Sequence, residues 1–333
     1  MKKGLKFLGG LIAMVIALSF GLYFLSPGTL LNAASSMAVQ SGGFNKHTIE
    51  MDGEQYFYFD NENIGQPVLI FVHGFSDEKA SWFPFVNEFS KKYRVIAPDL
   101  LGHGENKKDT TISYTFLRQA EFLKSFLEEL NIQQPHLIGA SMGGAVVGKF
   151  ASIYPAELSS VTFISSAGIN GNTEESALQQ FMDQFPSDEL KKENMPLLPK
   201  DMSDKSLAQF KKFIFYKDLN VPEKLMKYYM KRSVEHRDFY FNVMQDIVYT
   251  DNGAFKDALD DELDNIVVPV LVIWGKQDPL LDVSSVKVFE DSVSAPLTIA
   301  LIDDCGHATL AEQPQETRQP IIDFIGKLEG INL

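Results

Sequence analysis

The sequence predicts an α/β fold with a mostly parallel central sheet, flanking helices on both faces and one helical insertion. Short apolar runs alternate with helix-like segments, and this alternation stops between Gly168 and about Asp261. The 333 residues are 45% hydrophobic and 22% charged, as expected for a globular chain with a sizeable core. We divide the chain into an N-terminal segment (1–43), a first core part (44–167), an insertion (168–262) and a second core part (263–333).

The N-terminal segment combines a basic start with a long apolar run. Lys2, Lys3 and Lys6 precede the uncharged run 7–25. A spanning helix needs about 20 apolar residues, whereas the apolar part of a cleaved signal has about 7–15. We therefore expect an uncleaved signal-anchor, with the folded domain on the extracytoplasmic side because the lysines precede the helix. The alternative is a secreted or periplasmic domain released by cleavage near the small residues 33–36.

Charge and cysteine content argue against several partners and sites. The formal net charge is −14 and the basic residues form no long run, so we expect no nucleic-acid partner. Cys305 is the only cysteine, so an intrachain disulfide and a thiolate-rich zinc site are both impossible. We expect no cofactor and no metal ion.

The first core part opens with a hairpin and continues with buried strands. The strand-like runs 46–51 and 55–59 flank Asp52-Gly53, a strong signal for a two-residue turn. The apolar runs 67–72 and 94–97 are typical of strands buried on both faces. Further along we expect helices at 114–130, 143–153 and 315–327, and strands at 136–138, 161–165, 267–274 and 297–302.

The strongest local motif is Gly139-Ala140-Ser141-Met142-Gly143, followed by another glycine. It lies between a predicted strand and a predicted helix, which is the context of the Gly-x-Ser-x-Gly nucleophile elbow. A serine there has a strained backbone, and the glycines leave room where side chains would collide. A nucleotide-binding loop is a weaker alternative, because neither Gly-x-Gly-x-x-Gly nor Gly-Lys-Ser/Thr is present at this place.

A serine nucleophile needs a base and an acid, which follow it in the order serine, acid, histidine. Only His236 and His307 lie downstream of Ser141, and we expect His236 on the surface of the insertion. Asp278 lies in the segment 275–279, which directly follows the strand that ends at residue 274, whereas its rival Asp282 is expected at a helix start. The sequence therefore predicts Ser141, Asp278 and His307 as a catalytic triad.

The amides of Met142 and Phe75 are the predicted oxyanion-hole donors, and both residues are predicted to contact the substrate. His73, two residues before Phe75, is expected to bond loop backbone and not to act as a base. Asp99 opens the turn 99–104, where one carboxylate and one histidine are too few ligands for a metal. We expect Asp99 to fix backbone amides and Cys305 to be a packed small side chain.

Together these motifs resemble the α/β-hydrolase superfamily, over residues 45–333. The segments that carry the resemblance are 73–76, 139–144, 275–278 and 305–307. The apolar N-terminus and the segments 195–199, 274–278 and 281–284 are closer to the membrane-anchored monoacylglycerol lipase branch and to related bacterial lipases. The resemblance implies a lipase or esterase for monoacylglycerols or short- to medium-chain acyl esters, with a helical cap over the acyl pocket.

The insertion contains many apolar residues, and we expect most of them to pack it against the core. A few of these residues should line an acyl pocket. Since the predicted catalytic groups lie outside the insertion, we expect it to set acyl-chain preference without taking part in the chemical step. Its apolar residues include Phe181, Met182, Phe185, Phe210, Phe213, Ile214 and Phe215.

Two other functions stay open. A carbon–carbon bond hydrolase of ring-cleavage products shares the string Ser-Met-Gly-Gly at 141–144, but its charged dienoate substrate would need an arginine or a similar anion clamp. A catalytically inactive, hydrolase-like binding protein would not need the triad.

The apolar run 7–25 leads to a prediction about membrane partition. The full-length protein should sediment with membranes, because a helix satisfies its own backbone hydrogen bonds within lipid. A chain beginning at Gly43 should stay in the supernatant and keep its activity. A mature N-terminus at or near Ser35, found by sequencing the purified protein, would instead show that the segment is cleaved.

Overall fold

An eight-stranded sheet organises the computed structural model, in the strand order β1-β2-β4-β3-β5-β6-β7-β8. β2 pairs antiparallel with β1 and β4, and all other neighbours are parallel, which confirms the predicted mostly parallel α/β fold. The structure describes residues 43–83, 85–170, 195, 197–217, 223–248 and 254–331. The strands are β1 (Asn45–Met51), β2 (Glu54–Asp60), β3 (Val68–Val72), β4 (Arg94–Pro98), β5 (His136–Ala140), β6 (Ser160–Ile164), β7 (Val270–Gly275) and β8 (Leu297–Ile302).

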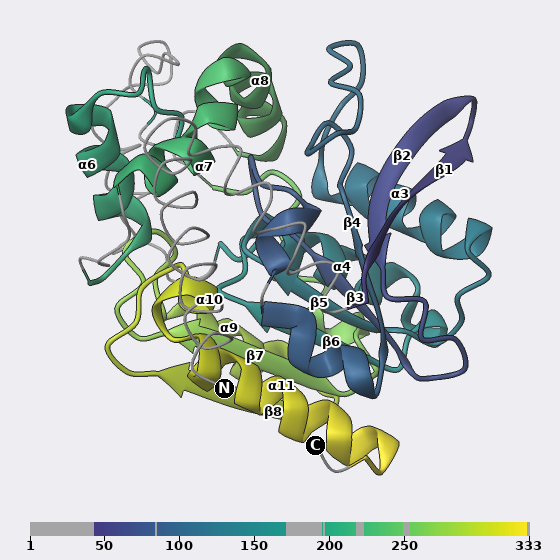
Figure 1. The fold of residues 1–333 in the computed structure, drawn as a ribbon. Coiled ribbons are helices and arrows are strands. Elements are labelled where there is room, and N and C mark those ends of the chain that lie inside the picture. The colour runs from purple at the N-terminus through teal and green to yellow at the C-terminus, as the bar shows by residue number, and fades with distance from the viewer. Residues whose placement is uncertain are drawn as a thin grey trace, which may run out of the picture.

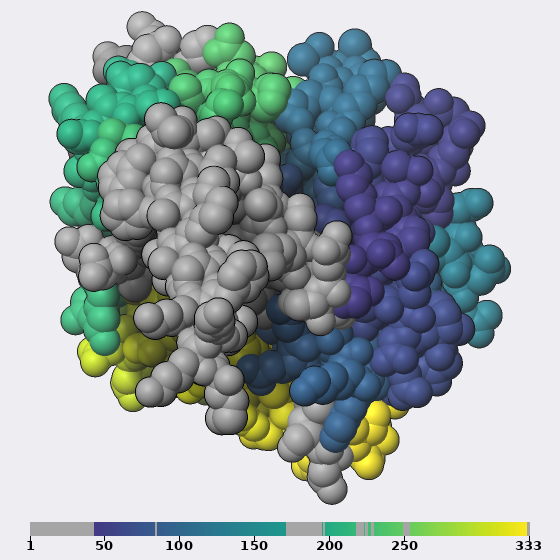
Figure 2. All heavy atoms as spheres, in the orientation of Figure 1, coloured from purple at the N-terminus to yellow at the C-terminus, as the bar shows by residue number. Residues whose placement is uncertain are grey.

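The predicted hairpin forms one edge of the sheet. Asp52 and Gly53 connect β1 to β2, and both have positive φ, 53° and 78°. Positive φ at both central residues belongs to the type I′ turn, whose twist matches that of paired strands. The hairpin is the purple element along one side of the molecule in Figures 1 and 2, away from the green helices.

Helices cover both faces of the sheet, as predicted (Figure 1). Alternate residues of β3 supply the two apolar layers: Ile70 and Val72 belong to one cluster, Leu69 and Phe71 to the other. The first layer includes α3 (Phe116–Glu129), α4 (Met142–Ile153) and α9 (Ser285–Ser292). The second includes the 3₁₀ segments η1 (Lys79–Trp82) and η2 (Phe85–Lys91) and the helix α11 (Pro314–Glu329). Shorter elements are η3 (Pro155–Glu157), η5 (Leu263–Asn265) and α10 (Thr309–Glu312).

One strand begins later than its apolar run predicts. The run starts at Val267, but β7 begins at Val270, and Val267 is 66% exposed. Pro269 stands directly before β7. Because proline has no N–H to donate, it is tolerated at the start of a strand but not in its interior. The other predicted strands and the three predicted helices lie where expected, with ends shifted by a few residues.

Between β6 and β7 the described residues contribute helices but no strand to the sheet. They include α6 (Asp204–Ile214), α7 (Glu223–Glu235) and α8 (Arg237–Ile247), which we call the cap. Figure 1 shows the cap at one end of the sheet, in teal and green. The insertion boundaries 168 and 262 stay a prediction, and the predicted cap residues Phe181, Met182 and Phe185 lie outside the described residues.

The predicted signal-anchor, with the whole of 1–42, also lies outside the described residues. Within the ranges that the structure does describe, no helix combines the length and the apolar character needed to cross a bilayer.

The start of α4 packs unusually closely on the end of β3. A Cβ atom built on Gly143 would lie 2.5 Å from the His73 carbonyl oxygen and closer still to that of Val72. A Cβ atom on Gly139 would overlap the carbonyl group of Gly143 in the same way. Since backbone oxygens cannot rotate aside, this junction needs glycine at both positions.

We therefore expect Gly143→Ala to lower the free energy of unfolding by about 1–3 kcal/mol, the usual cost of overpacking. Gly148→Ala, later in α4, is the matched control. The atoms nearest to its methyl group are side-chain ends of Leu259 at 2.6 Å and Phe163 at 2.7 Å, which yield more readily than backbone oxygens, and alanine favours a helix by about 1 kcal/mol. Denaturant unfolding of both variants measures the difference, and an equal or reversed ranking would contradict the packing argument.

Candidate active site

Ser141 forms the sharp turn between β5 and α4. Its backbone has φ 51° and ψ −122°, a conformation that a non-glycine residue adopts only under strain. Its amide donates to the Ile164 carbonyl at 2.9 Å, and its own carbonyl accepts from the Ala167 amide at 3.0 Å. These bonds to the end of β6 hold the strained turn in place. The half-buried hydroxyl thereby lies beside the N-terminus of α4, where the helix dipole favours negative charge.

The structure brings the side chains of His307 and Asp278 to this serine. His307 Nε2 lies 3.0 Å from the Ser141 hydroxyl, and His307 Nδ1 lies 2.8 Å from Asp278 Oδ2. A carboxylate can only accept, so Nδ1 carries the proton and Nε2 is left to accept from the hydroxyl. The other oxygen of Asp278 accepts from the amides of Leu280 and Leu281, both at 2.9 Å, which fixes the carboxylate.

The rival residues lie elsewhere. Asp282 accepts from the Ser284 amide at 2.8 Å, just before α9, as expected for an acid at a helix start. His236 is exposed and stands directly before α8, where its side chain makes no capping hydrogen bond. Of the candidates that follow the serine, only Asp278 and His307 therefore form a chain of hydrogen bonds to Ser141.

The two amides predicted for the oxyanion hole flank the serine. Met142 is the first residue of α4, and a Cβ atom on Gly74, next to Phe75, would lie 3.3 Å from Ser141 Cβ. Within the described part of the chain, neither the Phe75 amide nor the Met142 amide donates to another group. Among the described residues, both amides therefore lack an acceptor, which is compatible with a role in binding an oxyanion.

His73 fixes the turn that carries Phe75. Its Nδ1 donates to the Gly74 carbonyl at 2.8 Å and its Nε2 accepts from the Leu100 amide at 3.0 Å. Burial lowers the pKa of His73 to about 3, so the ring is neutral, as this pattern of one donor and one acceptor requires. The expected backbone role of His73 agrees with these contacts.

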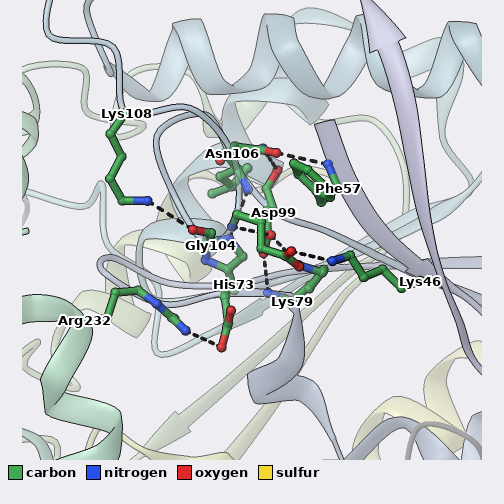
Figure 3. Close-up of polar contacts among 12 residues, drawn as sticks. Lys46, Phe57, His73, Lys79, Asp99, Gly104, Asn106, Lys108 and Arg232 are labelled. Atoms are coloured by element: carbon green, nitrogen blue, oxygen red, sulfur yellow. Dashed lines mark hydrogen bonds and ion pairs between the residues drawn. The ribbon is translucent and has the colours of Figure 1, made fainter. Parts of the chain in front are cut away.

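Asp99 organises the loop behind this turn (Figure 3). Its carboxylate accepts from the amides of Lys79 at 2.8 Å and Glu105 at 2.9 Å, which matches the expectation that it fixes backbone amides. The partner of this carboxylate, which the sequence did not predict, is the fully buried Lys79, whose Nζ lies 2.6 Å from Asp99 Oδ2. Burial alone would lower the pKa of Lys79, but the carboxylates of Asp99 and Glu105 raise it above its ordinary value.

An apolar pocket opens beside Ser141. The core supplies Phe75, Met142 and Leu281 to its wall, and α8 supplies Met244 and Ile247. The apolar residues expected from segment 210–215 are not part of this wall: Phe213 and Ile214 pack on the large core cluster, and Phe210 and Phe215 pack within the cap. None of its described lining residues is charged: Phe75, Ser141, Met142, Ala167, Leu197, Met244, Ile247, Val248, Phe255, Leu280 and Leu281.

Cys305 is buried under the same end of the sheet. Burial raises the pKa of its thiol to about 12, so the thiolate needed for nucleophilic attack does not form near neutral pH. This agrees with the interpretation of Cys305 as a packing residue.

A mostly parallel sheet whose central strand leads through a strained serine into a helix defines the class of the α/β hydrolases. The sequence model of the alpha/beta hydrolase fold family matches residues 67–314, and the chain belongs to this family. It is 27% identical to monoacylglycerol lipase ABHD6 of Mus musculus over 325 residues, which are 97% of this chain and 94% of that one. It is also 25% identical to lipase 1 of Psychrobacter immobilis, over 93% of this chain and 96% of that one.

A solved structure gives a similar result. The crystal structure of a membrane phospholipase A, described as a bacterial virulence factor, superposes with a TM-score of 0.81 and 26% identity over 99% of both chains.

The contacts of Asp278 and Asp282 lead to a prediction about the two acids. Asp278→Asn should lower kcat by about 10⁴-fold, because an amide donor opposite Nδ1 would stabilise the wrong tautomer of His307. Asp282→Asn removes only an acceptor before α9 and should keep most of the activity. Ester hydrolysis by both folded variants checks the ranking, and comparable losses would count against Asp278 as the acid.

Proposed function

We propose that this chain hydrolyses carboxylic esters of lipids, preferring monoacylglycerols or short- to medium-chain acyl esters, with Ser141 as the nucleophile. The chain is an ester-hydrolysing serine hydrolase of the lipase and esterase type, as its family and relatives indicate. The observation that carries our assignment is the run of hydrogen bonds from Asp278 through His307 to Ser141 at the mouth of an uncharged apolar pocket.

In the acylation step, Ser141 attacks the ester carbonyl while His307 Nε2 takes its proton. Asp278 holds the imidazole in the required tautomer and stabilises its charged form. The amides of Phe75 and Met142 stabilise the oxyanion, and His307 then gives its proton to the leaving alcohol. A water molecule, activated by the same imidazole, attacks the acyl-enzyme and releases the fatty acid.

The pocket lining supports an acyl tail as the group that lies beside the nucleophile. Burial of apolar surface contributes about 25 cal/mol per Å², so each additional methylene that the pocket encloses strengthens binding. A charged dienoate, the substrate of a carbon–carbon bond hydrolase, would find no cationic partner among the described lining residues. The pocket therefore favours ester hydrolysis over that alternative.

The proposal includes attachment to a membrane through the segment 7–25, as a signal-anchor with the hydrolase core on the extracytoplasmic side. Three lysines before the run support this orientation, and the length of the uncharged run is close to the roughly 20 residues that a spanning helix needs. A cleaved signal and a secreted or periplasmic enzyme is the alternative.

The test of the proposal is Ser141→Ala. The rate of ester hydrolysis by the folded variant should fall to about 10³–10⁴ times the uncatalysed rate in water. This remaining acceleration comes from substrate binding and the oxyanion hole. It should also lose labelling by a fluorophosphonate. The matched control is Ser159→Ala, a partly exposed serine whose hydroxyl donates to the Gln134 carbonyl, and this variant should keep both signals.

A panel of monoacylglycerols and p-nitrophenyl esters from acetyl to stearoyl measures the substrate preference of the parent protein. Undiminished turnover by the folded Ser141→Ala variant would refute the nucleophile. A parent protein that is neither labelled nor active on any ester would support the inactive binding protein instead.

A further inference from the structure

The loop that carries His307 is bonded directly to the end of cap helix α6. The Ile214 carbonyl accepts from the amides of His307 at 3.0 Å and of Ala308 at 3.3 Å. Gly306 lies so close to the cap that a Cβ atom built on it would be 2.5 Å from the Tyr216 nitrogen. The backbone of the histidine loop therefore rests on the cap backbone and not only on the core.

Glu312 reinforces this junction. It is the last residue of α10, the short helix that follows the histidine loop. Its Oε1 accepts from the Gly306 amide at 3.0 Å, and its Oε2 accepts from the amides of Tyr216 at 3.1 Å and Lys217 at 3.2 Å. Burial raises the pKa of Glu312 above its ordinary value, although the three amides act in the opposite direction. One half-buried carboxylate thus joins the histidine loop to the chain that leaves α6.

The second catalytic loop is attached to the cap on the other side. The hydroxyl of Ser76, directly after Phe75, lies 2.6 Å from the hydroxyl of Ser233 in α7. Ser76 has φ 57°, so this turn is strained and needs support from its neighbours. Next to it, the guanidinium of Arg232 forms an ion pair with Glu78, and Figure 3 shows Arg232 reaching from its helix toward this carboxylate.

We propose that the cap positions both catalytic loops for the chemical step: α6 with Glu312 holds the loop of His307, and α7 with Arg232 and Ser233 holds the loop of Phe75. The cap then contributes to turnover even for esters too short to enter the acyl pocket. This differs from the expectation that the cap sets only chain-length preference. The inference rests on the proposed function, because it assigns Glu312 and Arg232 as positioning residues for that same triad and oxyanion hole.

The cap can affect turnover because the reaction tolerates only small changes in the distances between the reacting groups. A misplacement of about 1 Å in a reacting group costs about 10²-fold in rate, since hydrogen-bond and attack geometries are both steep functions of distance. The His307 amide is bonded to the cap, and its ring makes the 3.0 Å contact with Ser141. Movement of the cap backbone therefore shifts the imidazole relative to the serine.

The experiment uses the full-length protein and p-nitrophenyl acetate, whose acyl group scarcely extends beyond the reacting carbonyl. Glu312→Ala should lower kcat by about 10²-fold with little change in KM. Glu312→Gln should fall between this variant and the parent, because its amide keeps one acceptor oxygen but places an NH₂ group against a backbone donor. The matched control is Glu316→Gln, an exposed acid four residues on, which should keep the parent kcat.

The α7 contact is tested in parallel. Arg232→Gln should lower kcat on the acetyl ester, whereas the control Lys231→Gln, at a side chain that is 61% exposed, should not. Because Arg232 and Glu78 act as one pair, the double variant with Glu78→Gln should lose less than the product of the two single losses. The rate of fluorophosphonate labelling of Ser141 should fall together with kcat in every affected variant.

A thermal melt shows that each variant is folded before it is assayed, and the conservative glutamine variants and Ser233→Ala serve where larger changes unfold the protein. Folded Glu312 and Arg232 variants with parent kcat on the acetyl ester, and losses only on long-chain esters, would overturn the inference. That outcome differs from failure of the proposed function, in which the parent protein itself hydrolyses no ester.

Discussion

The candidate active site depends on the backbone strain at Ser141. A left-handed conformation at a non-glycine residue is costly, and it persists only where the surroundings determine it more strongly than local preference does. Here Ile164 at the end of β6 and Ala167 just beyond it bond both sides of the turn. Gly139 and Gly143 let α4 approach β3 closely enough to place its first turn beside the Ser141 hydroxyl. The position of the hydroxyl is thus a property of the sheet and not of a loose loop.

Buried polar side chains support the turn beside Phe75. His73 contributes a neutral ring with one donor and one acceptor, whereas Asp99 and Lys79 contribute a buried ion pair. A buried pair gains little stability over apolar residues, but it is costly to break, since loss of the Lys79 ammonium would leave the buried Asp99 carboxylate without its cation. The pair with its backbone bonds therefore limits the alternative conformations of the chain that follows Phe75.

Local sequence was sufficient to predict the parts of this protein that depend on local chemistry. The Asp52-Gly53 turn, the parallel strands and the placement of Ser141, Asp278 and His307 at strand ends follow from turn residues, apolar runs and chain order. The start of β7 was wrong by three residues, because an apolar run does not show which of its residues pair.

The contacts missed from the sequence join segments that are far apart in the chain. Lys79 follows two other charged residues in the sequence, a pattern typical of the surface. It is nevertheless buried, because its ammonium group forms an ion pair with Asp99. Glu312 offers no signal either, since its partners are backbone amides beyond α6. The pocket wall from α8 depends on how the cap packs, which helical periodicity alone does not reveal.

The close approach of Gly306 to the backbone of residues 215–216 has a consequence for protein engineering. Caps are attractive units to exchange between related hydrolases, because they are contiguous in the chain and carry part of the substrate pocket. In this protein the exchange would also replace the surface on which the histidine loop rests. A transplanted cap would have to reproduce a carbonyl facing the His307 amide and leave room for the Glu312 carboxylate. The contacts between the cap and the histidine loop, and not the pocket alone, would decide whether such a chimera is active.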